Sequence, residues 1–193
     1  MQILLGSNSP RRSELLKSLG YDFTKVKIDC NEDFEGIETN KVAAYLAEKK
    51  SLAFASLGKD ELLITADTVV ICNNAILNKP ADKAEAESML RSLSSTVHTV
   101  VTGVCIRSLN NKIVFDNTTE VTMNTLSANE MNYYIDNYQP MDKAGSYGIQ
   151  EWIGLSKVAK LNGCFYNVMG LPTSMLYEVL TNKFNIFPAK IRK

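Results

Sequence analysis

The sequence predicts one α/β unit with mixed, largely antiparallel long strands. Residues 3–5 form an apolar strand that passes through a short turn into a helix starting at Pro10. Residues 62–66 and 69–72 form apolar runs, as expected of a buried strand, and two further long strands flank a turn at Asn110-Asn111. Strand-turn-helix passages are typical of α/β proteins, and hairpins add antiparallel pairs.

Composition favours a small ligand over a polymer or a membrane. The chain has 193 residues, with 21 Lys and Arg against 21 Asp and Glu, so no excess charge suggests binding to nucleic acid or an anionic surface. The chain opens directly on a strand, and no apolar run is long enough to span a bilayer. We therefore expect neither a nucleic-acid partner nor a membrane, and we allow for a homodimer.

Cysteine and histidine content indicate the compartment and the kind of metal. The four cysteines lie far apart without a Cys-x-x-Cys pair, which predicts reduced thiols in a cytoplasmic protein. His98 is the sole histidine, so a histidine-rich zinc site is excluded. A bound metal would be held by carboxylates and would be hard, such as Mg²⁺ or Mn²⁺.

The first turn and helix suggest an anion site. Ser9 is a good N-cap and Gly20 a good helix terminator. Arg11 and Arg12 then fall at the positive end of the helix dipole, which disfavours each by about 0.3–1 kcal/mol. With the hydroxyls of Ser7 and Ser9, the two arginines predict a binding site for a phosphate chain. An ordinary turn with its arginines in water is the alternative.

The next two elements add one carboxylate and one cation. A strand is expected over residues 23–28, followed by an acidic loop in which Glu32 is a candidate metal ligand, although such loops are usually only solvated. The helix at about 40–56 has an apolar stripe, and either Lys49 or Lys50 must lie on or beside it. A lysine there favours a nearby anion, unless its aliphatic stem covers the apolar surface and its ammonium group reaches solvent.

Asp67 is the most informative carboxylate. Asp67 and Thr68 interrupt the strand that begins at Leu62, and a carboxylate within such an apolar run needs a partner or a function. After a turn of two asparagines, residues 75–77 return as a short strand and place Lys79 at the end of a hairpin.

The remaining elements follow from caps and turns. Helices are expected to follow Asp82, Ser127 and Thr173, each of which is a suitable cap or starting residue. Residues 140–150 form a loop rich in glycine and charge, and residues 157–161 and 164–168 are expected to pair as a hairpin. The chain shows no repeat or linker, so we predict a single domain over residues 1–193.

Several blocks along the chain together resemble one family. They are S-N-S-P-R-R at 7–12, A-D-T-V at 66–69, N-K-P at 78–80, M-L at 89–90 with Leu93, H-T-V-V-T at 98–102, and the segments 140–150 and 168–172. In this order they are similar to Maf-like proteins, from the first strand to the last helix. The resemblance implies an inosine-triphosphatase-like α/β fold, a long mixed sheet flanked by helices with a cleft between two lobes.

The resemblance also implies a hydrolase of nucleotide metabolism, a metal-dependent nucleoside triphosphate pyrophosphatase that acts on dTTP and UTP, with modified pyrimidine nucleotides among the possible substrates. Six residues match the family's polar cleft positions, with Asp67 the proton acceptor: Ser7, Arg12, Glu32, Lys50, Asp67 and Lys79. Three match positions associated with base choice in the dTTP/UTP branch: Arg11, Thr68 and Gln150.

Three places depart from the family pattern. Asn78 and Ser95 stand where glycine is usual, and Glu151-Trp152 is unusual after Gly-Ile-Gln. The first two are expected to alter turns. The third lies beside Gln150 and therefore bears on base preference.

The physical interpretation of these residues agrees with the implied activity. Asp67, with Glu32, would hold the metal and activate a water that attacks the α-phosphorus. Lys50 and Arg12 would bind the triphosphate, and their replacement by alanine is expected to leave the melting temperature unchanged or raised. The alternative is a non-catalytic nucleotide-binding regulator of septum formation and cell division. A nucleic-acid-binding module is disfavoured by the neutral charge.

Overall fold

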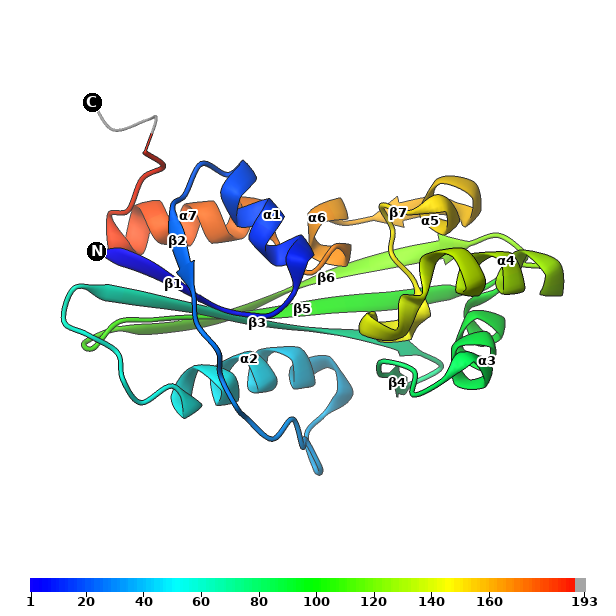
Figure 1. The fold of residues 1–193 in the computed structure, drawn as a ribbon, viewed down its shortest axis with the longest axis horizontal. Helices are drawn as coiled ribbons and strands as arrows, with labels where there is room; N and C mark the ends of the chain where they lie inside the picture. Colours follow the sequence, from blue (N-terminus) through cyan, green and yellow to red (C-terminus); the bar gives the residue numbers. More distant parts are fainter. Residues whose placement is uncertain (190–193) are drawn as a thin grey trace. The chain divides into compact units, whose positions relative to one another are not determined.

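The structure, a computed structural model, describes residues 1–189 and is a mixed α/β fold, as predicted. Its strands form one seven-stranded sheet in the order β2-β1-β3-β5-β6-β7, with β4 paired to β3 (Figure 1). The strands are β1 (Gln2–Gly6), β2 (Phe23–Lys25), β3 (Glu61–Cys72), β4 (Ala75–Leu77), β5 (Val97–Arg107), β6 (Lys112–Met123) and β7 (Val158–Asn162).

Seven α-helices and three 3-10 turns connect or flank these strands in the described chain. The helices are α1 (Pro10–Ser18), α2 (Val42–Ala53), α3 (Lys83–Leu93), α4 (Ala128–Tyr138), α5 (Trp152–Lys157), α6 (Phe165–Val168) and α7 (Thr173–Phe184). The 3-10 turns are η1 (Thr39–Lys41), η2 (Pro140–Asp142) and η3 (Ala144–Ser146).

The chain divides into two compact units. The first contains Met1–Asp67, Thr102–Asn117 and the residues from Gly170 onward, and the second contains Thr68–Val101 and Thr118–Met169. Three of the four boundaries fall inside β3, β5 and β6, and the fourth lies between Met169 and Gly170. The prediction of a single domain over residues 1–193 stays a prediction, as does the cleft, and residues 190–193 lie outside the described part.

The first unit is organised around β1. This strand pairs in parallel with β2 on one side and with β3 on the other, where Gly6 lies opposite Thr65. In Figure 1, α1 and α7 lie on one face of these strands and α2 on the other. Because both faces are covered, β1 and this part of β3 are apolar and almost wholly buried, as expected of parallel strands.

Gly103 lets α2 pack directly on β5. A β-carbon at Gly103 would lie 2.3 Å from the carbonyl carbon and oxygen of Ala43 and the nitrogen of Ala44. Only glycine fits where backbone approaches backbone this closely. The position of α2, and of every side chain that it carries toward the sheet, therefore depends on this residue.

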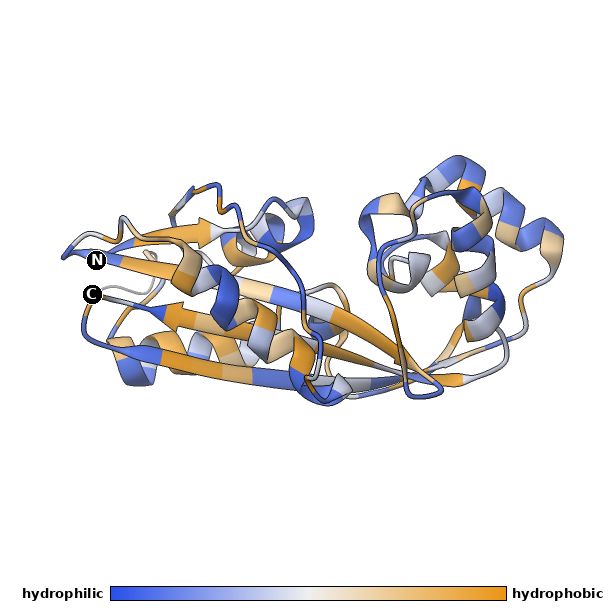
Figure 2. Ribbon diagram, turned by 90° about the horizontal axis from the view of Figure 1, so that it is seen from below, coloured by the Kyte–Doolittle hydropathy of each residue, from blue (hydrophilic) through white to orange (hydrophobic). Residues whose placement is uncertain are grey.

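The second unit has its own hydrophobic core. Leu90, Leu93, Val121, Tyr134 and Ile153 are all completely buried there. Figure 2 shows hydrophobic residues along the strands and hydrophilic residues on the outer parts of the helices. This is the amphipathic pattern from which these elements were predicted.

Most predicted elements are present, and three expectations were wrong. β3 continues through Asp67 without interruption. The expected second strand at 164–168 is instead α6, and β7 pairs in antiparallel fashion with β6. The strand expected at 23–28 ends at Lys25.

α5 was not predicted. It has only six residues, and α6 only four, so neither contains enough turns to show a helical period. Within residues 1–189, no helix is long and apolar enough to cross a membrane.

Candidate active site

The junction between β1 and α1 has the predicted cap. Ser9 has extended backbone angles (φ −66°, ψ 120°), and its Oγ accepts a hydrogen bond of 3.4 Å from the Arg12 amide. The Ser9 amide in turn donates to Ser7 Oγ at 3.2 Å. The backbone amides of Ser9 and Arg12 are therefore already hydrogen-bonded within the chain.

The Arg12 side chain joins three segments of the first unit. Its Nε donates to the Gly170 carbonyl at 2.8 Å, and its Nη1 donates to the Ala66 carbonyl at 2.9 Å and to Ser7 Oγ at 3.3 Å. Burial lowers the pKa of the guanidinium, and the negative charge of Asp67 partly offsets this effect. Arginine stays protonated despite such shifts, so Arg12 is a fixed positive charge beside the middle of β3.

Asp67 and Thr65 point toward α2 from the same face of β3. Thr65 Oγ1 donates to the Ala47 carbonyl at 2.6 Å, which fixes the helix against the strand. Two residues further along the strand and three along the helix, Lys50 Nζ lies 2.5 Å from Asp67 Oδ1. Residues two apart on a strand share a face, and residues three apart on a helix lie on nearly the same side. The contact of Thr65 with Ala47 therefore also brings Asp67 and Lys50 together.

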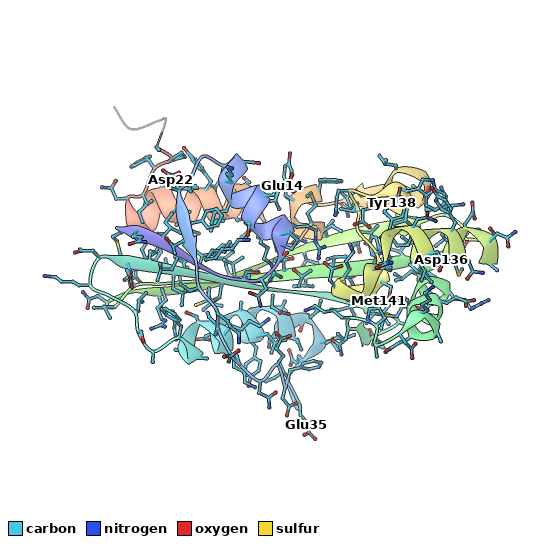
Figure 3. The ribbon with its side chains drawn as sticks, viewed as in Figure 1. Glu14, Asp22, Glu35, Asp136, Tyr138 and Met141 are labelled. Carbon is cyan, nitrogen blue, oxygen red and sulfur yellow. The ribbon has the colours of Figure 1, made fainter. Side chains whose placement is uncertain are left out.

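Glu32 approaches the same lysine from the acidic loop. Its Oε1 lies 2.9 Å from Lys50 Nζ. The loop is held by Asn31, whose Oδ1 accepts from the Asp33 amide at 2.8 Å, and by Lys49, whose Nζ donates to the Asp33 carbonyl at 2.7 Å. Figure 3 shows Glu35 at the far end of the loop, away from the sheet.

Lys50 is thus the centre of a small charged cluster. Its side chain is 15% exposed, that of Asp67 12% and that of Glu32 52%. The buried pair is Lys50 with Asp67, and Glu32 joins it from the solvent side. A lysine on the apolar stripe of the helix is therefore matched by an anion, as expected.

The donor set suits a hard divalent cation. Asp67 and Glu32 already converge on one positive centre, the Lys50 ammonium, and both offer carboxylate oxygens. Among residues 1–189 no cluster of three or more His, Cys, Asp or Glu side chains is present. Mg²⁺ is commonly bound by one or two carboxylates, with phosphate oxygens and water completing its shell, so these two residues fit it.

Of the other predicted residues, Lys79, Gln150 and Thr68 belong to the second unit. Lys79 follows β4 and is exposed, and its neighbour Asn78 accepts a hydrogen bond of 3.1 Å from the Gly145 amide. Gln150 is half-buried, and its Oε1 is buried without a hydrogen-bond partner in the described part of the chain. Thr68 is half-buried on β3, directly after Asp67. Arg11 lies in the first unit beside Arg12, at the start of α1, and is half-buried.

Sequence reasoning missed a buried polar network in the second unit. Lys143 lies 3.2 Å from Glu151 Oε1 and 2.8 Å from Asp142 Oδ1, and the Tyr134 hydroxyl bonds to Glu151 Oε2. Tyr134 could not be told from an ordinary core aromatic in the sequence. The departure from the family pattern at Glu151 was the one available signal.

The fold and the site define an α/β protein in which Arg12 and Lys50 lie with two carboxylates beside the start of a helix. A sequence model described as "Maf-like protein" matches residues 2–183. The chain belongs to the Maf-like protein family.

Three relatives named dTTP/UTP pyrophosphatase illustrate the similarity. The Porphyromonas gingivalis protein is 50% identical over 184 residues, 93% of this chain and 92% of that protein. The Parabacteroides distasonis protein is 46% identical, covering 93% and 94%, and the Flavobacterium psychrophilum protein is 43% identical, covering 94% of each chain. A solved structure of the Staphylococcus aureus Ham1 protein is 16% identical, with a TM-score of 0.44 over 64% of this chain and 72% of that one.

Proposed function

We propose that the chain hydrolyses dTTP and UTP to the nucleoside monophosphate and pyrophosphate. The observation that carries the proposal is the convergence of Asp67, Glu32 and Lys50, beside which Arg12 is a fixed positive charge. Relatives with the name dTTP/UTP pyrophosphatase, 43–50% identical over nearly the whole chain, support it. Modified pyrimidine nucleotides belong to the same proposed substrate class.

The cationic side chains bind the triphosphate. Lys50 and Arg12 neutralise phosphate oxygens, and Ser7 contributes a hydroxyl whose oxygen already accepts from Arg12 and Ser9. The N-terminus of α1 adds the positive end of its dipole. Lys79 and Ser9 complete the proposed phosphate-binding set.

Asp67 accepts a proton from the attacking water. The water oxygen forms a bond to the α-phosphorus, the bond from that phosphorus to the bridging oxygen breaks, and pyrophosphate leaves with the electron pair. Asp67 and Glu32 would hold a divalent cation, Mg²⁺ or Mn²⁺, which supplies charge neutralisation at the phosphate oxygens when bound. Lys50 fixes the direction of the Asp67 carboxylate, because it donates a hydrogen bond to Oδ1.

Base choice is assigned to Arg11, Thr68 and Gln150. An amide offers both a donor and an acceptor, which can match the O4 and N3–H edge of thymine or uracil. The buried Oε1 of Gln150 lacks a hydrogen-bond partner among the described residues, so it is available to accept from N3–H. Cytosine presents an amino group in place of O4, so it leaves the amide donor unpaired.

Initial rates of pyrophosphate release with Mg²⁺ test the proposal. We expect dTTP and UTP to exceed CTP and the purine triphosphates by about one to two orders of magnitude in kcat/KM. Gln150→Glu should narrow the gap between dTTP and CTP. Tight binding of dTTP without pyrophosphate release would favour the non-catalytic regulator of cell division.

The proposed setting is the cytoplasm. The four cysteines, all within the described residues, are free, as expected where thiols stay reduced. The net charge of zero supports a small-molecule substrate without nucleic acid. A homodimer stays a prediction, which sedimentation equilibrium tests.

A further inference from the structure

Residues 148–151 form a tight turn in which two neighbouring side chains fold over one glycine. The Glu151 amide donates to the Gly148 carbonyl at 3.0 Å. A β-carbon at Gly148 would lie 2.8 Å from Cδ of Glu151 and 3.1 Å from Nε2 of Gln150. The carboxylate and the amide therefore both occupy the space beside Gly148 that a β-carbon would fill.

The Glu151 carboxylate is held on both oxygens. Lys143 Nζ lies 3.2 Å from Oε1, and the Tyr134 hydroxyl donates to Oε2. The same hydroxyl accepts a hydrogen bond of 2.9 Å from the Gly148 amide, so Tyr134 joins the first and last residues of the turn. Tyr134 is completely buried, and the side chains of Lys143 and Glu151 are 8% and 18% exposed. Charged groups this buried hold their geometry well, because separating them leaves an unpaired charge.

Gln150 lies between these anchored positions. Its Oε1 is buried and has no hydrogen-bond partner among residues 1–189. An unpaired buried acceptor is unfavourable in the absence of a ligand. The unpaired Oε1 of Gln150 nevertheless lies on a turn that is fixed by the Lys143–Glu151 ion pair and by Tyr134.

We propose that Glu151 is a positioning residue that, through Lys143 and Tyr134, fixes the Gln150 amide and so sets the preference for thymine and uracil over cytosine. This inference rests on the proposed function. It assigns a role to the acidic residue at which the chain departs from the family pattern. A purely structural role would lower stability and slow all substrates alike.

Glu151→Gln tests the inference, because the amide cannot accept from both Lys143 and Tyr134. We expect the ratio of kcat/KM for dTTP to that for CTP to fall about tenfold, mainly through a higher KM for dTTP. Glu130→Gln is the matched control, since Glu130 is held by Lys157 Nζ at 2.5 Å and by the Ser127 hydroxyl at 2.8 Å. The Glu130→Gln protein should have a lower free energy of unfolding, but its ratio of kcat/KM for dTTP to that for CTP should stay that of wild type.

Two lysine variants provide a second test that does not depend on Glu151→Gln folding. Lys143→Arg preserves the charge and should retain most of the discrimination, whereas Lys143→Met should lose it. If wild-type protein prefers dTTP and each folded variant keeps that preference, the positioning role is wrong and the proposed function stands. If wild-type protein releases no pyrophosphate from dTTP or UTP, the proposed function fails and this inference fails with it.

Discussion

Removal of the Lys50 ammonium should destabilise the protein even without nucleotide. Lys50 Nζ lies 2.5 Å from Asp67 Oδ1, and the whole of Asp67 is 8% exposed. Breaking a fully buried ion pair by removing one partner costs about 3–5 kcal/mol. Because Lys50 retains 15% side-chain exposure and Arg12 is also nearby, we expect Lys50→Met to lower the free energy of unfolding by about 2–3 kcal/mol.

Urea denaturation at pH 7 without nucleotide measures this loss, and a double-mutant cycle with Asp67→Asn isolates the pair. The double variant should be more stable than the sum of the single losses implies, by about 1–3 kcal/mol. Lys112→Met is the matched control, because it removes an ion pair with Glu48 on α2, the helix that carries Lys50. The Lys112 ammonium lies 2.5 Å from Glu48 Oε1, and the two side chains are 40% and 34% exposed. The effect of Lys112→Met should be small, as for exposed ion pairs.

If the losses in unfolding free energy of Lys50→Met and Asp67→Asn are additive in the double variant, the two residues do not stabilise each other. The same conclusion would follow from a Lys50→Met protein that is at least as stable as wild type. This second outcome is the one expected from the sequence, where Lys50 and Arg12 are paired only with a ligand. The structure contradicts that premise, because Asp67 and Glu32 pair with Lys50 and three oxygen atoms accept from Arg12.

Three further outcomes are expected. Asp67→Asn should retain the fold and slow pyrophosphate release from dTTP by about 10²–10⁴-fold, because the amide cannot accept the proton; wild-type rates would remove Asp67 from the mechanism. Gly103→Ala should lower the free energy of unfolding by about 1–3 kcal/mol, since its β-carbon would lie 2.3 Å from the Ala43 carbonyl; unchanged urea midpoints would contradict this close approach. Burial lowers the pKa of His98 from 6.5 to about 4. Below pH 6.5 the unfolded chain therefore takes up a proton that the folded protein does not, so the free energy of unfolding is highest above pH 6.5 and decreases as the pH falls toward 4. The loss should reach about 3 kcal/mol in a pH series of urea denaturations, and a His98→Gln variant should lack this part of the slope.

The site was partly predictable, because residue type and local pattern indicate chemistry. An aspartate in an apolar strand, a lysine on an apolar helix stripe and a glutamate in a loop each indicated a polar function, and the structure brings Glu32, Lys50 and Asp67 together. Their roles in catalysis stay predictions. The contacts of Arg12 with Ala66 and Gly170 were beyond reach, since they join positions up to 158 residues apart.

The sequence by itself determined the elements whose signals are local. The Ser9 cap, the Ser127 capping box and the turn at Asn73-Asn74, where both residues have positive φ, depend on neighbours a few residues away. The same local blocks carry the family resemblance, which the match over residues 2–183 confirms.

Tertiary structure alone decided the features that depend on distant partners. β3 runs unbroken through Asp67 because Lys50, 17 residues earlier, neutralises a charge that strand propensity disfavours. α5 begins after a turn whose geometry depends on Tyr134 and Lys143 as much as on its own residues. In each case a long-range ion pair or hydrogen bond stabilises a conformation by more than the local sequence preference disfavours it. A pattern read over a few neighbouring residues cannot contain such a contact, because the partner lies far away in the sequence.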